Sequence, residues 1–171
     1  MYQGEKFAFI FNKSNLQTLK MQISENFTLE EMCKSAYAKH CEIDNTPGPI
    51  EKANIYRLVL EVLQPIRDEF GEPIIVNSCF RNKQVNEGVA GAKNSDHLYG
   101  AAADIKTISG KLLDNKRLWD CIIKLKNAGK IDCRQIIWEY GRRSVGPHWI
   151  HLSINHDMNK YKDNEVLYIL K

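Results

Sequence analysis

The alternation of apolar and polar positions divides the chain into helical and extended segments. The clearest helical pattern runs from about residue 50 to residue 70, where apolar side chains recur at close to helical spacing: Tyr56, Val59, Leu60, Leu63, Ile66 and Phe70. Pro65 inside this segment predicts a kink or a first-turn position, because proline lacks the N–H of a helical hydrogen bond. Gly71 is the residue type preferred just beyond a helix end. We interpret this helix as core scaffold without chemistry of its own.

Shorter segments complete the predicted set of elements. A capping-box spacing at residues 28–31 predicts a helix over 29–39, and two more helices are predicted over 82–90 and 114–127. Apolar runs bounded by turn residues predict strands over 73–78, 101–107, 134–140 and 147–153, with a closing strand over 166–170. Residues 7–11 are consistent with an edge strand or with an extension particular to this protein. A chain of 171 residues without repeat or linker fits one domain.

Composition excludes some classes of function but does not identify the function. The fractions of hydrophobic (43%) and charged (26%) residues are those of a soluble globular protein. A net charge of +3, without a basic run, does not indicate a nucleic-acid partner. No stretch approaches the roughly 20 apolar residues of a membrane span. The N-terminus lacks the basic region and cleavage site of a signal peptide, so we expect synthesis in the cytoplasm without export by that route.

The cysteines do not suggest a site. Their number, five, is odd, and no pair has Cys-x-x-Cys spacing. We expect mostly reduced, buried thiols, and the alternative is one or two disulfides formed after export.

The chemistry that the sequence offers is concentrated in residues 95–104, Ser-Asp-His-Leu-Tyr-Gly-Ala-Ala-Ala-Asp. His97 and Asp104 lie seven positions apart, and Asp104 falls within a predicted buried strand. A carboxylate is costly to bury unless it is paired or binds a metal ion. His151, on the strand-like run 147–153, supplies a second imidazole. Two imidazoles and a carboxylate make a zinc site with one open position, whereas the plainer reading is a surface histidine and a turn or capping aspartate.

The whole pattern resembles a known family. Ser-x-His-x-x-Gly-x-Ala-x-Asp, followed later by Trp-Ile-His-Leu-Ser, is similar to the zinc-dependent D,D-carboxypeptidases and L,D-endopeptidases that cleave peptidoglycan stem peptides, the M15 metallopeptidases. Residues 78–81, Ser-Cys-Phe-Arg, resemble that family's Ser-Gly-Tyr-Arg, with Cys79 in place of the glycine. The resemblance runs from about Phe27 to Ser153 and is closest to the phage-type, single-domain branch. It leaves residues 1–26 as an extension of uncertain structure and makes residues 27–171 the peptidase domain.

The resemblance implies a fold and a mechanism. The fold is α+β, a Hedgehog/D,D-peptidase-like zinc fold with a mostly antiparallel sheet of about four strands and helices on one side. Amide bonds in peptidoglycan stem peptides would be hydrolysed with a Zn²⁺ cofactor. The implied zinc ligands are His97, Asp104 and His151. Arg81 would hold the substrate through its guanidinium fork. Ser95 is predicted to bind the substrate or to orient a metal ligand through a hydrogen bond. The alternative is that Ser95 only shapes a turn.

The sequence does not decide which residue is the general base. Family members place an acid or a histidine a few residues before the last ligand, but no carboxylate lies between Gly141 and His151. We favour Glu139 as base with His148 assisting, and the reverse assignment stays open. A strand-end surface acid is the alternative for Glu139. Strand alternation also places His148 on the face opposite His151.

Other readings of the whole chain also remain. A catalytically weak or inactive zinc-binding module of the same fold, acting in cell-wall or virion binding, would show the same ligands. We expect stem peptides as partners, no nucleic acid and no membrane, and a monomer. Without a signal peptide, an enzyme of this kind reaches the wall by lysis or in a virion. His40 and His156 have no motif context and are predicted to be surface residues.

Overall fold

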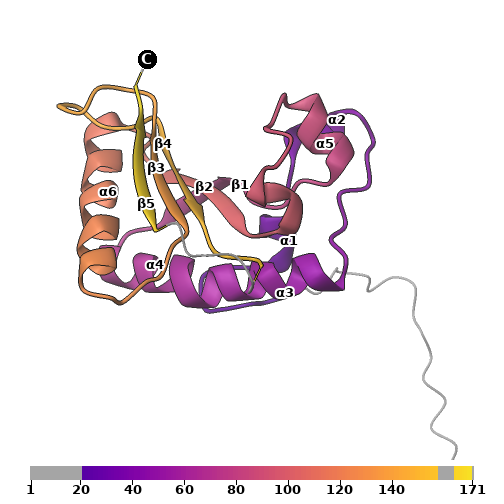
Figure 1. Cartoon of the computed structure of the whole chain (residues 1–171), viewed down its shortest axis with the longest axis horizontal. Helices are drawn as coiled ribbons and strands as arrows, with labels where there is room; N and C mark the ends of the chain where they lie inside the picture. Colours follow the sequence, from indigo (N-terminus) through magenta and orange to yellow (C-terminus); the bar gives the residue numbers. More distant parts are fainter. Residues whose placement is uncertain (1–20, 158–163, 171) are drawn as a thin grey trace, which may run out of the picture.

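A five-stranded sheet is the centre of the computed structural model, which describes residues 21–157 and 164–170 (Figure 1). Its strands are β1 (Ile74–Ser78), β2 (Ala102–Thr107), β3 (Gln135–Glu139), β4 (Trp149–Ser153) and β5 (Glu165–Ile169). The order across the sheet is β1-β2-β4-β3-β5, with every neighbouring pair antiparallel except β3 and β5. The α+β class is confirmed, and the sheet has one strand more than the four expected. The predicted edge strand over 7–11 lies outside the described residues.

The long predicted helix is confirmed as one continuous helical segment made of α3 (Pro49–Leu58), the π-helical turn η1 (Val59–Leu63) and α4 (Gln64–Phe70). The wide turn explains how Pro65 is accommodated. The N–H of Gln64 bonds to the carbonyl of Val59, five residues back instead of four. The regular hydrogen-bond pattern of the α-helix is therefore interrupted just before Pro65, which has no N–H to donate. Gly71 ends the helix in the left-handed conformation, with φ of 73°.

The predicted helix over 29–39 is wrong in one respect, because two short helices replace it: α1 (Leu29–Met32) and α2 (Ala36–His40). Thr28 starts the first, its hydroxyl accepting from the N–H of Glu31 at 3.3 Å. The hydroxyl of Ser35 accepts from the N–H of Ala38 at 3.2 Å and starts the second. A serine that caps a new helix competes with continuation of the preceding one, so the chain leaves the helix between them.

The core lies on one face of the sheet, as predicted. The inward residues of β2, β3 and β4 are fully or almost fully buried with residues of the long helix and of α6 (Leu112–Asn127): Ala103, Ile105, Ile136, Trp138, Ile150, Leu152, Leu58, Leu63, Ile66, Leu118 and Ile122. Trp119 of α6 packs edge-on against Trp138 of β3, with ring centroids 5.3 Å apart. Figure 1 shows α6 along one side of the sheet and the α3–α4 helix beneath it. None of the helices in the described segments is long and apolar enough to cross a membrane.

The opposite face of the sheet carries the candidate site. Burial alternates along β3 and β4, so that their other side chains are only partly covered. This face is flanked by a lobe that contains α5 (Lys83–Gly88) and the 3-10 turn η2 (Asp96–Tyr99). In Figure 1 the lobe with α2 and α5 lies across from the ends of β3 and β4.

Candidate metal centre

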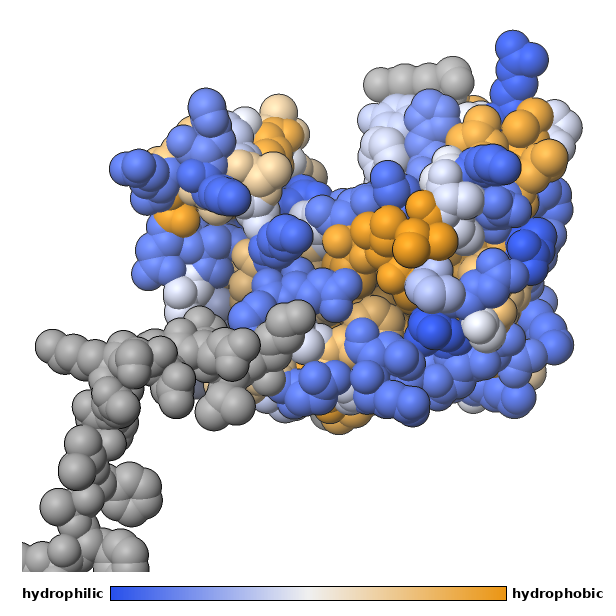
Figure 2. Space-filling model, turned by 180° about the vertical axis from the view of Figure 1, so that it is seen from behind, coloured by the Kyte–Doolittle hydropathy of each residue, from blue (hydrophilic) through white to orange (hydrophobic). Residues whose placement is uncertain are grey.

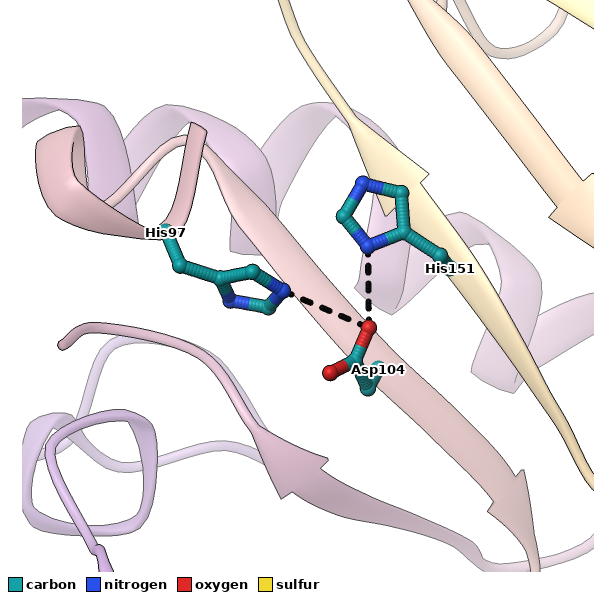
Figure 3. Close-up of side chains that lie close together, drawn as sticks. All are labelled: His97, Asp104 and His151. Carbon is teal, nitrogen blue, oxygen red and sulfur yellow. Dashed lines mark hydrogen bonds and ion pairs between the residues drawn. The ribbon is translucent and has the colours of Figure 1, made fainter. Parts of the chain in front are cut away.

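Strand register brings the three predicted metal ligands together. Asp104 on β2 is paired directly with His151 on β4, so both side chains lie on the same face of the sheet. His97 comes from η2, immediately before β2, and points its ring at the same place (Figure 3). One ligand atom from each of the three side chains can be chosen so that all lie within 4.8 Å of one another.

The His97–Asp104 distance matches the spacing of zinc ligands, whereas the His151–Asp104 distance is that of a hydrogen bond and would have to lengthen slightly around a metal ion. Oδ1 of Asp104 lies 3.3 Å from Nε2 of His97 and 2.9 Å from Nδ1 of His151 (Figure 3). Tetrahedral zinc, with bonds of about 2.0–2.2 Å, separates neighbouring ligand atoms by about 3.3–3.6 Å. Burial opposes ionisation of Asp104, but the facing imidazoles of His151 and His97 outweigh it and hold the pKa of that carboxyl well below its usual range. The carboxylate is therefore available as a ligand.

A backbone carbonyl fixes the tautomer of His97. Nδ1 of His97 lies 2.6 Å from the carbonyl oxygen of Cys79, which can only accept, so Nδ1 carries the proton. In the neutral ring Nε2 then presents a lone pair to the ionised Asp104. The two facing atoms, 3.3 Å apart, are both satisfied by a metal ion between them or, in the charged ring, by a proton on Nε2. The Cys79 side chain is fully buried, and this burial raises the pKa of its thiol.

Arg81 is held against the ligand set. Its Nη2 donates to Oδ2 of Asp104 at 2.8 Å and its Nε donates to the Ser78 hydroxyl at 2.7 Å. Its backbone N–H donates to the carbonyl of His97 at 3.1 Å. The guanidinium therefore lies at the β1 side of the site, where it lines the same cavity as the three ligands. Nη1 makes no hydrogen bond to the described residues.

Close packing explains why the motif has a glycine at position 100. Gly100 follows η2 with φ of 65°, a conformation that glycine adopts without strain. A Cβ at this position would lie 2.6 Å from the carbonyl oxygen of Glu51 and 2.9 Å from Cγ1 of Ile55, both on α3. The absence of a side chain thus allows η2, with His97, to pack directly on α3.

A cavity of about 630 Å³ surrounds the ligands. Its walls are the sheet and the lobe segment 89–95, and Figure 2 shows the molecule hollowed between this lobe and the sheet. Glu139 lines it, and burial, with a smaller contribution from Asp104 opposed by His151, raises the pKa of Glu139. A raised pKa suits a carboxylate that must accept and return a proton.

The remaining two predicted residues have different positions. Ser95 lines the cavity, and its hydroxyl accepts from the backbone N–H of His97 at 3.3 Å, which caps η2. His148 is exposed and is not among the residues that line the cavity. Its backbone N–H donates to the carbonyl of Glu139 at 2.9 Å, and its ring lies 6.2 Å from that of Tyr140. Its assisting role stays a prediction.

The structure also joins residues that the sequence analysis missed. The nearly buried carboxylate of Asp96 is paired with Nη1 of Arg134 at 2.6 Å and with Nε2 of His156 at 3.3 Å. His156 also stacks on Tyr99, with ring centroids 4.1 Å apart. The prediction that His156 is a surface residue is wrong, whereas His40 is exposed as expected. No spacing could reveal this cluster, because its members come from distant parts of the chain.

Comparison with known proteins agrees with the geometry. The chain is 37% identical over 84 residues to a zinc D-Ala-D-Ala carboxypeptidase of Streptomyces albus G, a match that covers 47% of this chain and 31% of that relative. The chain therefore matches less than a third of the relative's length. The family model for Peptidase M15 matches residues 25–125, which include His97 and Asp104. Because this match covers more than half of the sequence, the chain belongs to the Peptidase M15 family.

Proposed function

We propose that this protein is a zinc-dependent peptidase that hydrolyses amide bonds in peptidoglycan stem peptides. The observation that carries the proposal is the convergence of His97, Asp104 and His151 in one cavity. The ring Nδ1–H of His97 donates to a backbone carbonyl, which leaves Nε2 to face the site. The relative's name, a zinc D-Ala-D-Ala carboxypeptidase, supports zinc as the metal and a D-alanyl peptide as substrate.

The cavity supplies the groups that amide hydrolysis needs. Zinc held by the three ligands would supply a Lewis acid and an acidified water. Glu139 takes the proton of the attacking water at a carboxylate oxygen and returns it to the departing amine. Its raised pKa makes that return easier than it would be for an ordinary glutamate. His148 is the second candidate for proton transfer, but its exposed position outside the cavity lining favours Glu139.

Arg81 is assigned to the substrate. Its bonds to Ser78 and Asp104 fix the guanidinium at the edge of the ligand set. Nη1 remains to bind a carboxylate or the oxyanion that develops on the scissile carbonyl. Ser95, on the cavity wall beside His97, lies where a substrate amide or carboxylate can meet its hydroxyl.

Hydrolysis of purified peptidoglycan by the zinc-loaded protein tests the proposal, with the products identified by mass. We expect cleavage that is lost in His97→Ala and in the presence of a chelator. His40→Ala is the matched control, because it removes an exposed histidine outside the cavity. A protein that binds one zinc ion tightly and cleaves no stem peptide would instead be a binding module of the same fold.

A further inference from the structure

A buried carboxylate ties the turn that carries His97 to the far side of the sheet. Asp96 directly precedes His97 in η2 and keeps only 8% of its surface exposed. Its Oδ2 lies 2.6 Å from Nη1 of Arg134, and its Oδ1 lies 3.3 Å from Nε2 of His156. Burying a carboxylate costs free energy unless its oxygens are paired, and here each oxygen has a partner from a different part of the chain. We call Asp96, Arg134 and His156 the Asp96 cluster.

Arg134 is a rigid anchor for this carboxylate. It lies just before β3, where its backbone N–H donates to the carbonyl of Ser153 at 2.7 Å. Its own carbonyl accepts from the N–H of Glu165 at 2.9 Å. Arg134 is thus fixed by β4 and β5, the two strands that flank β3, and its guanidinium reaches Asp96 from a defined position.

His156 connects the same carboxylate to the strand that carries His151. It follows His151 along the chain, and its ring stacks on Tyr99 at the end of η2, with centroids 4.1 Å apart and planes 12° apart. The N–H of Ile154 donates to the carbonyl of Ala101 at 2.9 Å. The segment after β4 therefore runs beside η2 and contacts both of its ends.

The contacts of η2 described earlier come from other directions. The carbonyl of Cys79 and the backbone N–H of Arg81, both just beyond β1, hold the ring and the carbonyl of His97. Gly100 packs on α3. In the strand order β1-β2-β4-β3-β5, β1 is two positions away from β4, so these contacts do not involve the strand of the third ligand. The Asp96 cluster supplies a link to that strand.

We propose that Asp96 is a positioning residue that sets the separation of the His97 and His151 rings, and thereby the affinity of the site for zinc. The two ring centroids are 5.1 Å apart. Zinc tolerates ligand distances only within about 0.2 Å of the preferred values, so a small shift of η2 relative to β4 weakens binding. Arg134 and His156 hold the residue next to His97, and loss of the carboxylate releases η2 from both. The proposal rests on the zinc site of the proposed function, but not on its substrate.

The test measures zinc affinity without any peptide. Asp96→Asn keeps the size of the side chain, removes its charge and replaces one acceptor oxygen by an NH₂ group, which then faces another donor. We expect the Kd for zinc to rise about tenfold, the lower end of the 10–100-fold loss that follows removal of a partner bonded directly to a ligand. Cobalt(II) bound in place of zinc should show an altered visible absorption spectrum, because that spectrum reports the geometry of the ligands.

Other variants control for general effects. His156→Gln keeps an N–H that can donate to Asp96, so it should bind zinc more tightly than His156→Ala. Glu69→Gln is the matched control for the loss of charge. Glu69 also pairs with two cations, Lys124 at 2.6 Å and Lys130 at 3.7 Å, but it lies outside the cavity lining. Its replacement should change neither the zinc affinity nor the cobalt spectrum.

Thermal unfolding, measured in parallel, separates positioning from general support of the fold. A lower Tm in Asp96→Asn, with unchanged zinc affinity and an unchanged cobalt spectrum, would overturn the proposal even if the wild type cleaves stem peptides. In that case the proposed function would stand. If the wild type binds zinc and cleaves no stem peptide, while Asp96→Asn weakens zinc binding and alters the spectrum, the positioning role stands and the proposed function fails.

Discussion

Replacing Gly100 by alanine should destabilise the protein strongly and weaken its metal site. The left-handed backbone, at φ of 65°, costs an alanine about 1–2 kcal/mol. The new Cβ would also lie 2.6 Å from the carbonyl oxygen of Glu51, and the shift that relieves such a contact costs about 1–3 kcal/mol more. The sum, about 2–5 kcal/mol, corresponds to a fall in Tm of about 4–20 °C for a chain of this size. Since the shift moves η2, which carries His97, zinc affinity should fall too.

Gly71→Ala separates the two contributions. Gly71 has almost the same backbone conformation, with φ of 73°, but a Cβ there would meet no described atom within 4 Å. We therefore expect only the backbone cost and a fall in Tm of about 2–8 °C, with zinc affinity unchanged. Thermal unfolding by circular dichroism and zinc titration measure both effects. Equal losses of Tm in the two variants, or an unchanged zinc affinity in Gly100→Ala, would refute the packing argument.

Three further predictions concern the base, the metal and the thiols. Glu139→Gln should lower kcat by about 10²–10⁴-fold and leave zinc binding intact, while His148→Gln keeps most activity; the opposite ranking would exchange their roles. Because a base must be ionised and the pKa of Glu139 is raised, the acid limb of kcat/KM should lie above pH ~4.3 and disappear in Glu139→Gln. Free zinc at 100 times its Kd should raise Tm by about 5–11 °C, and the same rise in His97→Ala would exclude the assigned site. Iodoacetamide should modify exposed Cys41 first, and early modification of buried Cys79 would contradict the packing.

Local sequence patterns predicted most of the helices and strands. The predictions that failed concern places where a specific contact, rather than the local pattern, determines the structure. The spacing of apolar residues over 50–70 was sufficient for the long helix, because one face of it is buried from Asn54 to Ile66, although Leu60 of the predicted pattern is exposed. The break in the first helix was not predicted, since it depends on Ser35 capping a new helix rather than on periodicity. The parallel pairing of β5 with β3 could not be derived either, because register between distant strands leaves no signal in a single sequence.

The proximity of the three proposed ligands was predicted through the family resemblance, whereas the contacts that support them were not. The resemblance identified His97, Asp104 and His151 as residue types in order along the chain. The carbonyl that orients His97 belongs to Cys79, 18 residues away, and any residue type has a carbonyl to offer. Asp96 gave no signal, because its partners lie 38 and 60 positions further along the chain. Such contacts exist only after the sheet has formed.

The distribution of the three ligands along the chain sets an order of events during synthesis. His97 and Asp104 leave the ribosome almost together, but His151 follows Asp104 by 47 residues. At about 5–20 residues per second, the third ligand emerges roughly 2–9 s after the second. Until then the proposed ligand set is incomplete. If these three residues hold the zinc ion, its capture waits for β4, so the metal can stabilise the fold only once every strand except β5 has been synthesised.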